Sequence, residues 1–149
     1  MNISNTKIAI LIPKKINFKK SLVREIILEL SKEIGFSIVS INVSFVDKKE
    51  ILELNGKYLN HHFTTDILTF NYNGSNSDLD GEIIISYEDA VENAQRFNIS
   101  GKEEYLRLII HGILHLVGYD DQQINDKLKM KRKETSLVKK LNYLVLNKQ

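Results

Sequence analysis

The stretch HGILHLVGYDD, residues 111–121, is the most informative part of this 149-residue sequence. His111 and His115 are four residues apart, and residues at this spacing share one face of an α-helix. Gly118 follows three residues later, at a position where it would end such a helix. After this turn the chain can bring the carboxylate of Asp121 back toward the two imidazoles. The spacing therefore predicts a helix with a three-ligand metal site at its C-terminal end.

The predicted ligands suit zinc, which proteins bind through imidazole nitrogen, thiolate sulfur and carboxylate oxygen. The sequence has no cysteine, so imidazole and oxygen ligands alone remain and no disulfide can form. Three protein ligands leave the fourth position of a tetrahedral zinc ion open, as in catalytic rather than structural sites. The alternative is that both histidines are core or boundary residues of a mostly apolar helix.

The flanking sequence predicts an α+β fold. Apolar residues alternate in some segments, as in strands, and recur every three or four residues in others, as in helices. Expected strands cover residues 7–12, 37–46 (with a bulge near 39–40), 66–72 and 82–86, and expected helices cover 18–34, 48–58, 87–97, 102–117 and 124–146. The loop 73–80 would join two strands as a hairpin. We expect a small four-stranded mixed sheet packed with about five helices, including a metalloprotease-like metal-binding helix.

The composition indicates one globular domain that spans residues 1–149. A hydrophobic content of 42% and a charged content of 27% are ordinary for such a domain, and the length suits one core rather than two. The sequence has no run of about 18 apolar residues and no basic segment ahead of its first apolar run. We therefore expect a cytoplasmic protein with no membrane partner.

Two basic clusters, residues 14–24 and 127–140, stand out against a net charge of only +2. Clustered lysine and arginine can attract the phosphates of a nucleic acid. The alternative is that both clusters are solvated helix faces.

The histidine spacing resembles the zinc motif of the metzincin proteases, with an aspartate as third ligand. The protease motif has a glutamate general base directly after the first histidine. Here that residue is Gly112, which disfavours peptide hydrolysis by this route. The segment HGILHLVGYD more closely resembles HGxLHLxGYDH, the signature of the YbeY family of bacterial rRNA maturation factors, described as metal-dependent endoribonucleases.

The resemblance to the YbeY family extends over most of the chain. LNGKYLNHHFTTDILTF (54–70) is similar to the family pattern LNxxYRxxDxPTDVLSF, and DGEIIIS (80–86) is similar to GDIxIS. The resemblance implies a single-strand-specific endoribonuclease with one zinc ion per chain. It would act in 16S rRNA 3′-end maturation and ribosome quality control, with precursor 16S rRNA and the small ribosomal subunit as partners.

The resemblance also assigns residue roles. His111 and His115 would be catalytic and would hold the metal together with Asp121. Thr65 and Asp66 match the family, and we expect them to open a strand, bond the loop, or hold a ligand histidine through its second ring nitrogen.

Several positions depart from the family pattern. Asp121 replaces the usual third histidine, and Asp120 is an alternative oxygen donor. Leu59 replaces an arginine suited to clamping a phosphate, and His62 replaces an aspartate. His62 could donate protons or contact RNA, or be a simple exposed loop residue.

The departures keep two alternative functions open. One is a ribosome-associated assembly factor that binds metal but has little nuclease activity, which the missing arginine favours. The other is a metal-dependent hydrolase of another substrate, against which Gly112 argues.

Overall fold

The computed structural model describes residues 7–59 and 65–146. Within these residues the chain forms four strands and five α-helices, and α1 continues into one π-helical turn, η2. In chain order the elements are β1 (Ile8–Leu11), α1 (Lys20–Leu30), η2 (Ser31–Gly35), β2 (Ser37–Val46), α2 (Lys48–Leu59), β3 (Ile67–Asn71), β4 (Asp78–Ser86), α3 (Tyr87–Phe97), α4 (Gly101–Leu116) and α5 (Ile124–Leu146). None of these helices is long and apolar enough to cross a membrane.

The four strands form one mixed sheet in the order β1-β2-β4-β3. β2 runs parallel to both β1 and β4, whereas β3 and β4 pair antiparallel as the predicted hairpin. The register of β2 against β4 shifts between Ile38 and Ser40, where the sequence predicts a bulge. The predicted α+β fold with a four-stranded mixed sheet is therefore confirmed.

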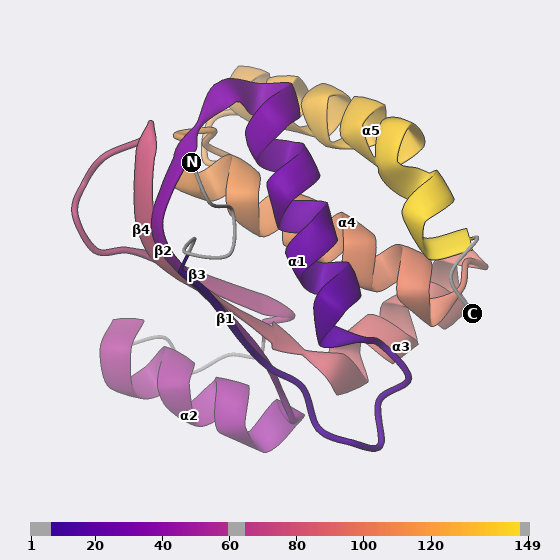
Figure 1. The fold of residues 1–149 in the computed structure, drawn as a ribbon. Helices are drawn as coiled ribbons and strands as arrows, with labels where there is room; N and C mark the ends of the chain where they lie inside the picture. The colour runs from indigo at the N-terminus through magenta and orange to yellow at the C-terminus, as the bar shows by residue number, and fades with distance from the viewer. Residues whose placement is uncertain (1–6, 60–64, 147–149) are drawn as a thin grey trace.

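Helices cover the two faces of the sheet unequally. Figure 1 shows α2 alone on one face, while α1, α4 and α5 are stacked on the other. On the α2 side, Ile51 packs with Val46, Leu68 and Ile84 in a small buried cluster. The opposite side holds the main core, to which β4 contributes Ile83 and Ile85. β4 is therefore an interior strand with apolar side chains on both faces, which explains its uninterrupted EIIIS sequence.

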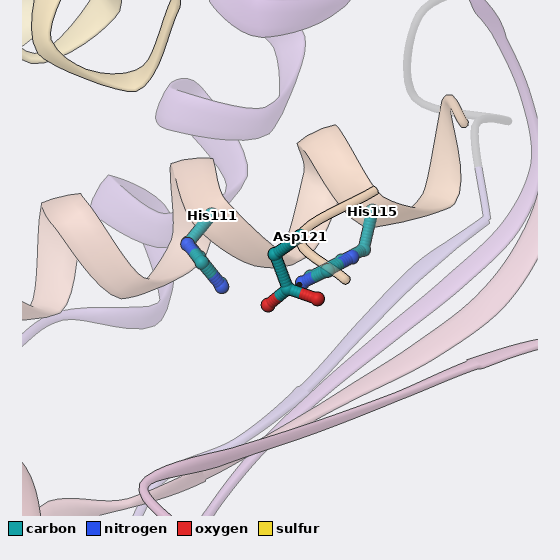
Figure 2. A group of neighbouring side chains, drawn as sticks. All are labelled: His111, His115 and Asp121. Atoms are coloured by element: carbon teal, nitrogen blue, oxygen red, sulfur yellow. Dashed lines mark ion pairs between the residues drawn. The ribbon is translucent and has the colours of Figure 1, made fainter. Parts of the chain in front are cut away.

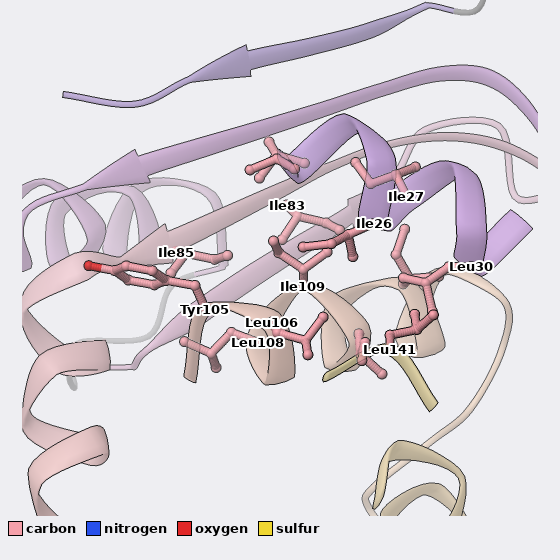
Figure 3. Packing of buried hydrophobic residues seen from close by; sticks show 14 of the residues in the cluster. Ile26, Ile27, Leu30, Ile83, Ile85, Tyr105, Leu106, Leu108, Ile109 and Leu141 are labelled. Carbon is pink, nitrogen blue, oxygen red and sulfur yellow. The ribbon is translucent and has the colours of Figure 1, made fainter. Parts of the chain in front are cut away.

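α4 lies at the centre of the main core. Figure 3 shows side chains from α1, β4 and α5 meeting the buried residues of α4. The labelled residues of this layer are Ile26, Ile27 and Leu30 from α1, Ile83 and Ile85 from β4, Tyr105, Leu106, Leu108 and Ile109 from α4, and Leu141 from α5. An element surrounded in this way has little freedom to move, so side chains on its remaining face are rigidly placed.

Both ends of α4 have defined caps. The Ser100 hydroxyl accepts from the backbone N–H of Glu103, and the Glu103 side chain accepts from the Ser100 N–H, which makes a capping box. At the other end, Gly118 has a φ of +104°, a value that favours glycine. Its N–H donates to the His115 carbonyl, and the Tyr119 N–H donates to the Leu114 carbonyl. This is a Schellman motif, and it turns the chain back as the sequence predicts.

Two predicted boundaries are wrong. β4 begins at Asp78, inside the predicted loop, because exposed or half-buried Asp78 and Asp80 alternate with Leu79, which is only 1% exposed. The polar residues resemble a loop in sequence but lie on the outer side of a strand. The first helix is regular only from Lys20 to Leu30, and its predicted end is the π-helical turn that reaches Gly35 at a φ of +91°.

Gly112 is a point of close approach between α4 and the sheet. A Cβ at this position would lie 3.0 Å from both Cδ1 and Cγ2 of Ile83 and 3.2 Å from Cδ1 of Ile67. These distances are shorter than ordinary carbon–carbon contacts, so a side chain at this position would force Ile83, Ile67 or the helix itself to shift by a few tenths of an ångström. Glycine at this position in HGILH therefore serves packing, in addition to removing the glutamate that a protease needs.

We predict that Gly112→Ala destabilises the protein by about 1–3 kcal/mol, the usual cost of overpacking a core. Urea unfolding followed by circular dichroism measures the change. The matched control is Gly101→Ala in the same helix, where a Cβ meets no atom within 4 Å. This control should be neutral or slightly stabilising, because alanine has the higher helix propensity. Equal stability of Gly112→Ala and the wild type would contradict the close-packing explanation.

Candidate metal centre

Three potential metal ligands meet at the C-terminal end of α4. The ligand atoms of His111, His115 and Asp121 all lie within 4.8 Å of one another. Figure 2 shows the Asp121 carboxylate between the two imidazole rings, with Asp121 returning on the segment that follows α4. The rings are 4.8 Å apart between centroids and nearly perpendicular. The structure therefore brings together the three residues predicted from the spacing.

The geometry of the group suits a tetrahedral zinc ion. Ligand atoms about 2.0–2.1 Å from such an ion are about 3.3 Å apart. The distance from His115 Nε2 to Asp121 Oδ2 is 3.6 Å, so this pair is nearly in place. The wider spacing within the group, up to 4.8 Å, needs a modest approach of one ligand. Asp121 has the most freedom to adjust, because its side chain is 47% exposed and lies outside the helix, whereas each histidine side chain is 23% exposed.

His111 is held from behind by Glu134 on α5. Glu134 Oε1 lies 2.6 Å from His111 Nδ1, and the Glu134 side chain is only 4% exposed. A carboxylate can only accept, so Nδ1 carries the hydrogen and the lone pair of Nε2 is left for a metal. Carboxylates that accept from the second nitrogen of a ligand histidine fix its tautomer and increase its basicity. This arrangement favours metal binding over a purely structural role for His111.

Glu134 itself is held in the ionised form. Burial opposes its charge, but the hydrogen bond from His111 and the positive charges of Arg107 and Lys131 outweigh burial and lower the pKa of the Glu134 carboxyl. Arg107 Nη1 donates to Glu134 Oε2 at 3.2 Å, and Lys131 Nζ lies 3.6 Å from the same oxygen. The carboxylate is therefore satisfied on both oxygens and is fixed in position behind the His111 ring.

His115 is kept neutral by its surroundings. Burial and the neighbouring His111 lower the pKa of the His115 imidazole, and Asp121 opposes this shift only in part. The neutral imidazole is the form that binds a metal, so a lowered pKa extends metal binding to lower pH.

Arg107 links this site to a second buried carboxylate, Glu104. Arg107 donates from Nε and Nη2 to the two oxygens of Glu104 at 2.8 and 2.7 Å. The Glu104 side chain is fully buried, so this bidentate pair is strong and costly to break. It raises the pKa of the guanidinium, which stays charged. Glu104, Arg107, His111 and His115 are spaced three or four residues apart, so they form one polar stripe on α4.

The polar chain continues to Asp66, just before β3. The side-chain amide of Asn93 donates to Glu104 Oε2 and to Asp66 Oδ2, each at 3.1 Å. Hydrogen bonds and ion pairs thus run without a gap from Asp66 through Asn93, Glu104, Arg107 and Glu134 to His111. The aspartate of the TDILTF segment is connected to the candidate site through this chain, without touching a histidine itself.

Thr65, Asp66 and Asp120, which were also singled out in the sequence, lie outside the three-residue group. Thr65 Oγ1 donates to the Ile67 carbonyl at the start of β3, so Thr65 bonds the backbone that leads into this strand. The contact with the second nitrogen of a ligand histidine, considered above for Thr65 and Asp66, is made by Glu134 instead. Asp120 accepts from the Gln122 N–H in the loop and is not part of the three-residue group.

Two of the departures from the family pattern, Leu59 and His62, lie close together in the sequence. Leu59 is the last residue of α2 and is 39% exposed. His62 lies outside the described residues.

Sequence reasoning missed Glu134, although the sequence contains a signal for it. The buried positions of α5 include Met130, Glu134, Leu137, Leu141 and Leu144, which recur at alternating steps of four and three residues. Glu134 is the only charged residue on this apolar stripe. Its basic neighbours in KMKRKETS made the whole segment resemble a solvated face, whereas the periodicity places the carboxylate inside.

The fold and the site together define an α+β protein with a histidine–histidine–aspartate group on a glycine-terminated helix. The sequence profile of the family described as Endoribonuclease YbeY matches residues 2–142. A protein of that name from Chlorobium limicola is 39% identical over 115 residues, which cover 77% of this chain and 79% of the relative. Another from Flavobacterium psychrophilum is 39% identical over 117 residues, or 78% and 80% of the two chains.

A solved structure agrees with the sequence matches. The solution structure of a protein from Thermotoga maritima superposes with a TM-score of 0.61 and 32% sequence identity, and the match covers 94% of this chain and 89% of that one. The chain therefore belongs to the Endoribonuclease YbeY family.

We predict that Glu134→Gln lowers the affinity for Zn²⁺ by about 10–100-fold, the usual effect of losing the carboxylate behind a ligand histidine. The substitution keeps the shape of the side chain but removes the charge that orients and polarises His111. A competition titration against a chromophoric chelator measures the affinity.

The matched control for this prediction is Glu33→Gln, which removes a carboxylate that pairs with Lys140 away from the site. It should bind zinc as the wild type does. An unchanged affinity in a folded Glu134→Gln variant would show that Glu134 does not support a metal ligand.

Proposed function

We propose that residues 1–149 form, as one domain, a zinc-dependent endoribonuclease that cleaves single-stranded RNA. In this proposal its substrate is precursor 16S rRNA, whose 3′ end it matures on the small ribosomal subunit in the cytoplasm, and it also serves ribosome quality control. The observation that carries the proposal is the group of His111, His115 and Asp121, with Glu134 behind it. Membership of the Endoribonuclease YbeY family supports RNA as the substrate.

In this proposal each residue of the site has a different role in metal binding. Glu134 holds His111 in the tautomer that presents Nε2, and burial keeps His115 neutral. Asp121 brings the negative charge and leaves the outer side of the group open to solvent. When bound, Zn²⁺ supplies Lewis-acid stabilisation of a phosphoryl oxygen and lowers the pKa of water toward about 7. An RNA phosphodiester reaching the open side would then meet both effects.

The arrangement does not favour a peptide hydrolase. The protease glutamate would occupy position 112, where a side chain would begin against Ile83 and Ile67 in the core. The buried Glu134 contacts His111 on Nδ1, behind the ring, where its role is to orient the ligand. Neither position offers the general base of the helical zinc proteases.

A second candidate is an assembly factor that binds RNA and metal but cleaves poorly. Leu59 favours it, because a leucine cannot neutralise a phosphate as the arginine expected at this position would. The two candidates differ in a single property, the cleavage of RNA by the zinc-loaded protein.

We predict that His115→Ala abolishes RNA cleavage by the zinc-loaded protein. The loss should exceed the about 10–100-fold effect of changing a residue behind a ligand, because a ligand itself is removed. Cleavage of a fluorescent single-stranded RNA is measured by gel electrophoresis, and circular dichroism checks that the variant is folded.

The control for contaminating nuclease is the same protein treated with a chelator and then reloaded with zinc, which should lose and regain activity. Cleavage that persists in folded His115→Ala would refute the proposed site. A wild type that binds zinc and RNA but leaves the RNA intact would favour the assembly factor.

A further inference from the structure

A hollow with mostly apolar walls adjoins the candidate metal centre on the α5 side. Its volume is about 410 Å³, and His111 and Asp121 form part of its lining. We call it the apolar hollow; its apolar walls are Ile124, Leu128 and Met130, and the charged residues Arg107, Lys127, Lys131 and Glu134 also line it. Ile124 and Leu128 are 75% and 50% exposed, an unusual exposure for side chains beside a polar site. A flat apolar group bound there would lie directly beside the metal ligands.

A second hollow follows farther along α5. We call it the basic hollow; it is lined by Lys131, Arg132, Thr135, Ser136, Lys139 and Lys140. Lys131 lines the apolar hollow as well, so the two hollows adjoin at this residue. From Lys131 to Lys139 the helix rises about 12 Å. The surface therefore changes from apolar to basic along one helix, starting at the metal ligands.

Two of the cationic side chains that line the basic hollow are not engaged in ion pairs within the described part of the chain. Lys131 lies near Glu134, and Lys140 pairs with Glu33 at 3.0 Å. Arg132 and Lys139 form no ion pair with any residue that the structure describes. Unpaired cations beside the hydroxyls of Thr135 and Ser136 are the groups that contact the phosphates of a nucleic acid.

We propose that α5 carries the RNA strand away from the metal centre. A nucleobase next to the scissile phosphate occupies the apolar hollow, and the following phosphates lie over the basic hollow. This inference rests on the proposed function, which it extends by giving the substrate a path. Apolar walls and phosphate contacts read no base edges, so the path accepts many sequences.

The other basic cluster is less suitable as an RNA path. The hollow at the start of α1 is lined by Lys19 and Lys102 but also by Glu25, and it includes none of the metal ligands. The apolar hollow, in contrast, shares two of the three ligands.

The test is the binding of a fluorescein-labelled, mixed-sequence single-stranded RNA to the full chain, followed by anisotropy at several salt concentrations in the presence of a chelator. The double variant Arg132→Gln/Lys139→Gln should bind at least tenfold more weakly at low salt. Its slope of log affinity against log salt should fall by about 1.4, since each lost phosphate contact on a single strand contributes about 0.7. The matched control Lys19→Gln/Lys20→Gln removes the same charge from exposed residues at the start of α1 and should change neither value appreciably.

A second variant tests the apolar hollow. Leu128→Ala removes a half-exposed wall and should leave the fold intact, which thermal unfolding checks. It should weaken the binding of RNA several-fold but should not affect the binding of an abasic oligonucleotide of equal length. Equal effects on both ligands would overturn the placement of a base there.

The remaining outcomes separate this inference from the proposed function. An unchanged salt slope for Arg132→Gln/Lys139→Gln, or a larger loss for the α1 control, would overturn the path along α5. Displacement of RNA from α5 by equally low concentrations of polyglutamate would assign this face to an acidic protein and also overturn it. Binding with the expected pattern, without cleavage by the zinc-loaded wild type, would support the path and refute the nuclease.

Discussion

The contact between Gly112 and Ile83 is the constraint on which the rest of the structure depends. With no side chain between them, α4 lies directly on the centre of the sheet. The side of α4 that carries Gly112 is then committed to the core, and the stripe that includes His111 and His115 lies on an adjacent side of the helix. Because the Schellman motif at Gly118 ends the helix one turn later, Asp121 returns to the same side. One packing contact and one turn thus bring the three candidate ligands together.

A second constraint comes from two buried carboxylates, Glu104 on α4 and Glu134 on α5. Glu104 and Glu134 would be costly to bury alone, and Arg107 between them compensates both. This chain fixes the angle at which His111 presents its free nitrogen. Burying these two carboxylates lowers the stability of the fold. A role in holding His111 as a metal ligand explains why they are buried, and the fold itself gives no other reason. The polar chain also explains how Asp66, which contacts neither histidine, can influence the site through Asn93.

Much of the fold and part of the site could be predicted from the sequence. Helical spacing identified His111 and His115, and Gly118 implied the return of Asp121. The β3–β4 hairpin and the mixed sheet followed from alternating segments and their order. The start of β4 was wrong because Asp78 and Asp80 are polar residues of a strand edge, which local composition cannot distinguish from a loop.

The supporting residues were harder to predict because they depend on tertiary contacts. Glu134 is 23 residues from His111, and only the crossing of α4 and α5 brings the two together. The role of Gly112 as a contact with the sheet likewise requires the fold. His62 lies outside the described residues, so its role stays a prediction.

The central claim is that His111, His115 and Asp121 hold one zinc ion while Glu134 supports His111 from behind. Anomalous diffraction at the zinc edge, from crystals grown with Zn²⁺, tests it most directly. The account predicts one peak at about 2.0–2.2 Å from His111 Nε2, an imidazole nitrogen of His115 and an Asp121 oxygen, with Nδ1 of His111 still bonded to Glu134. A peak on other residues, or no peak at this group in the presence of excess zinc, would contradict it.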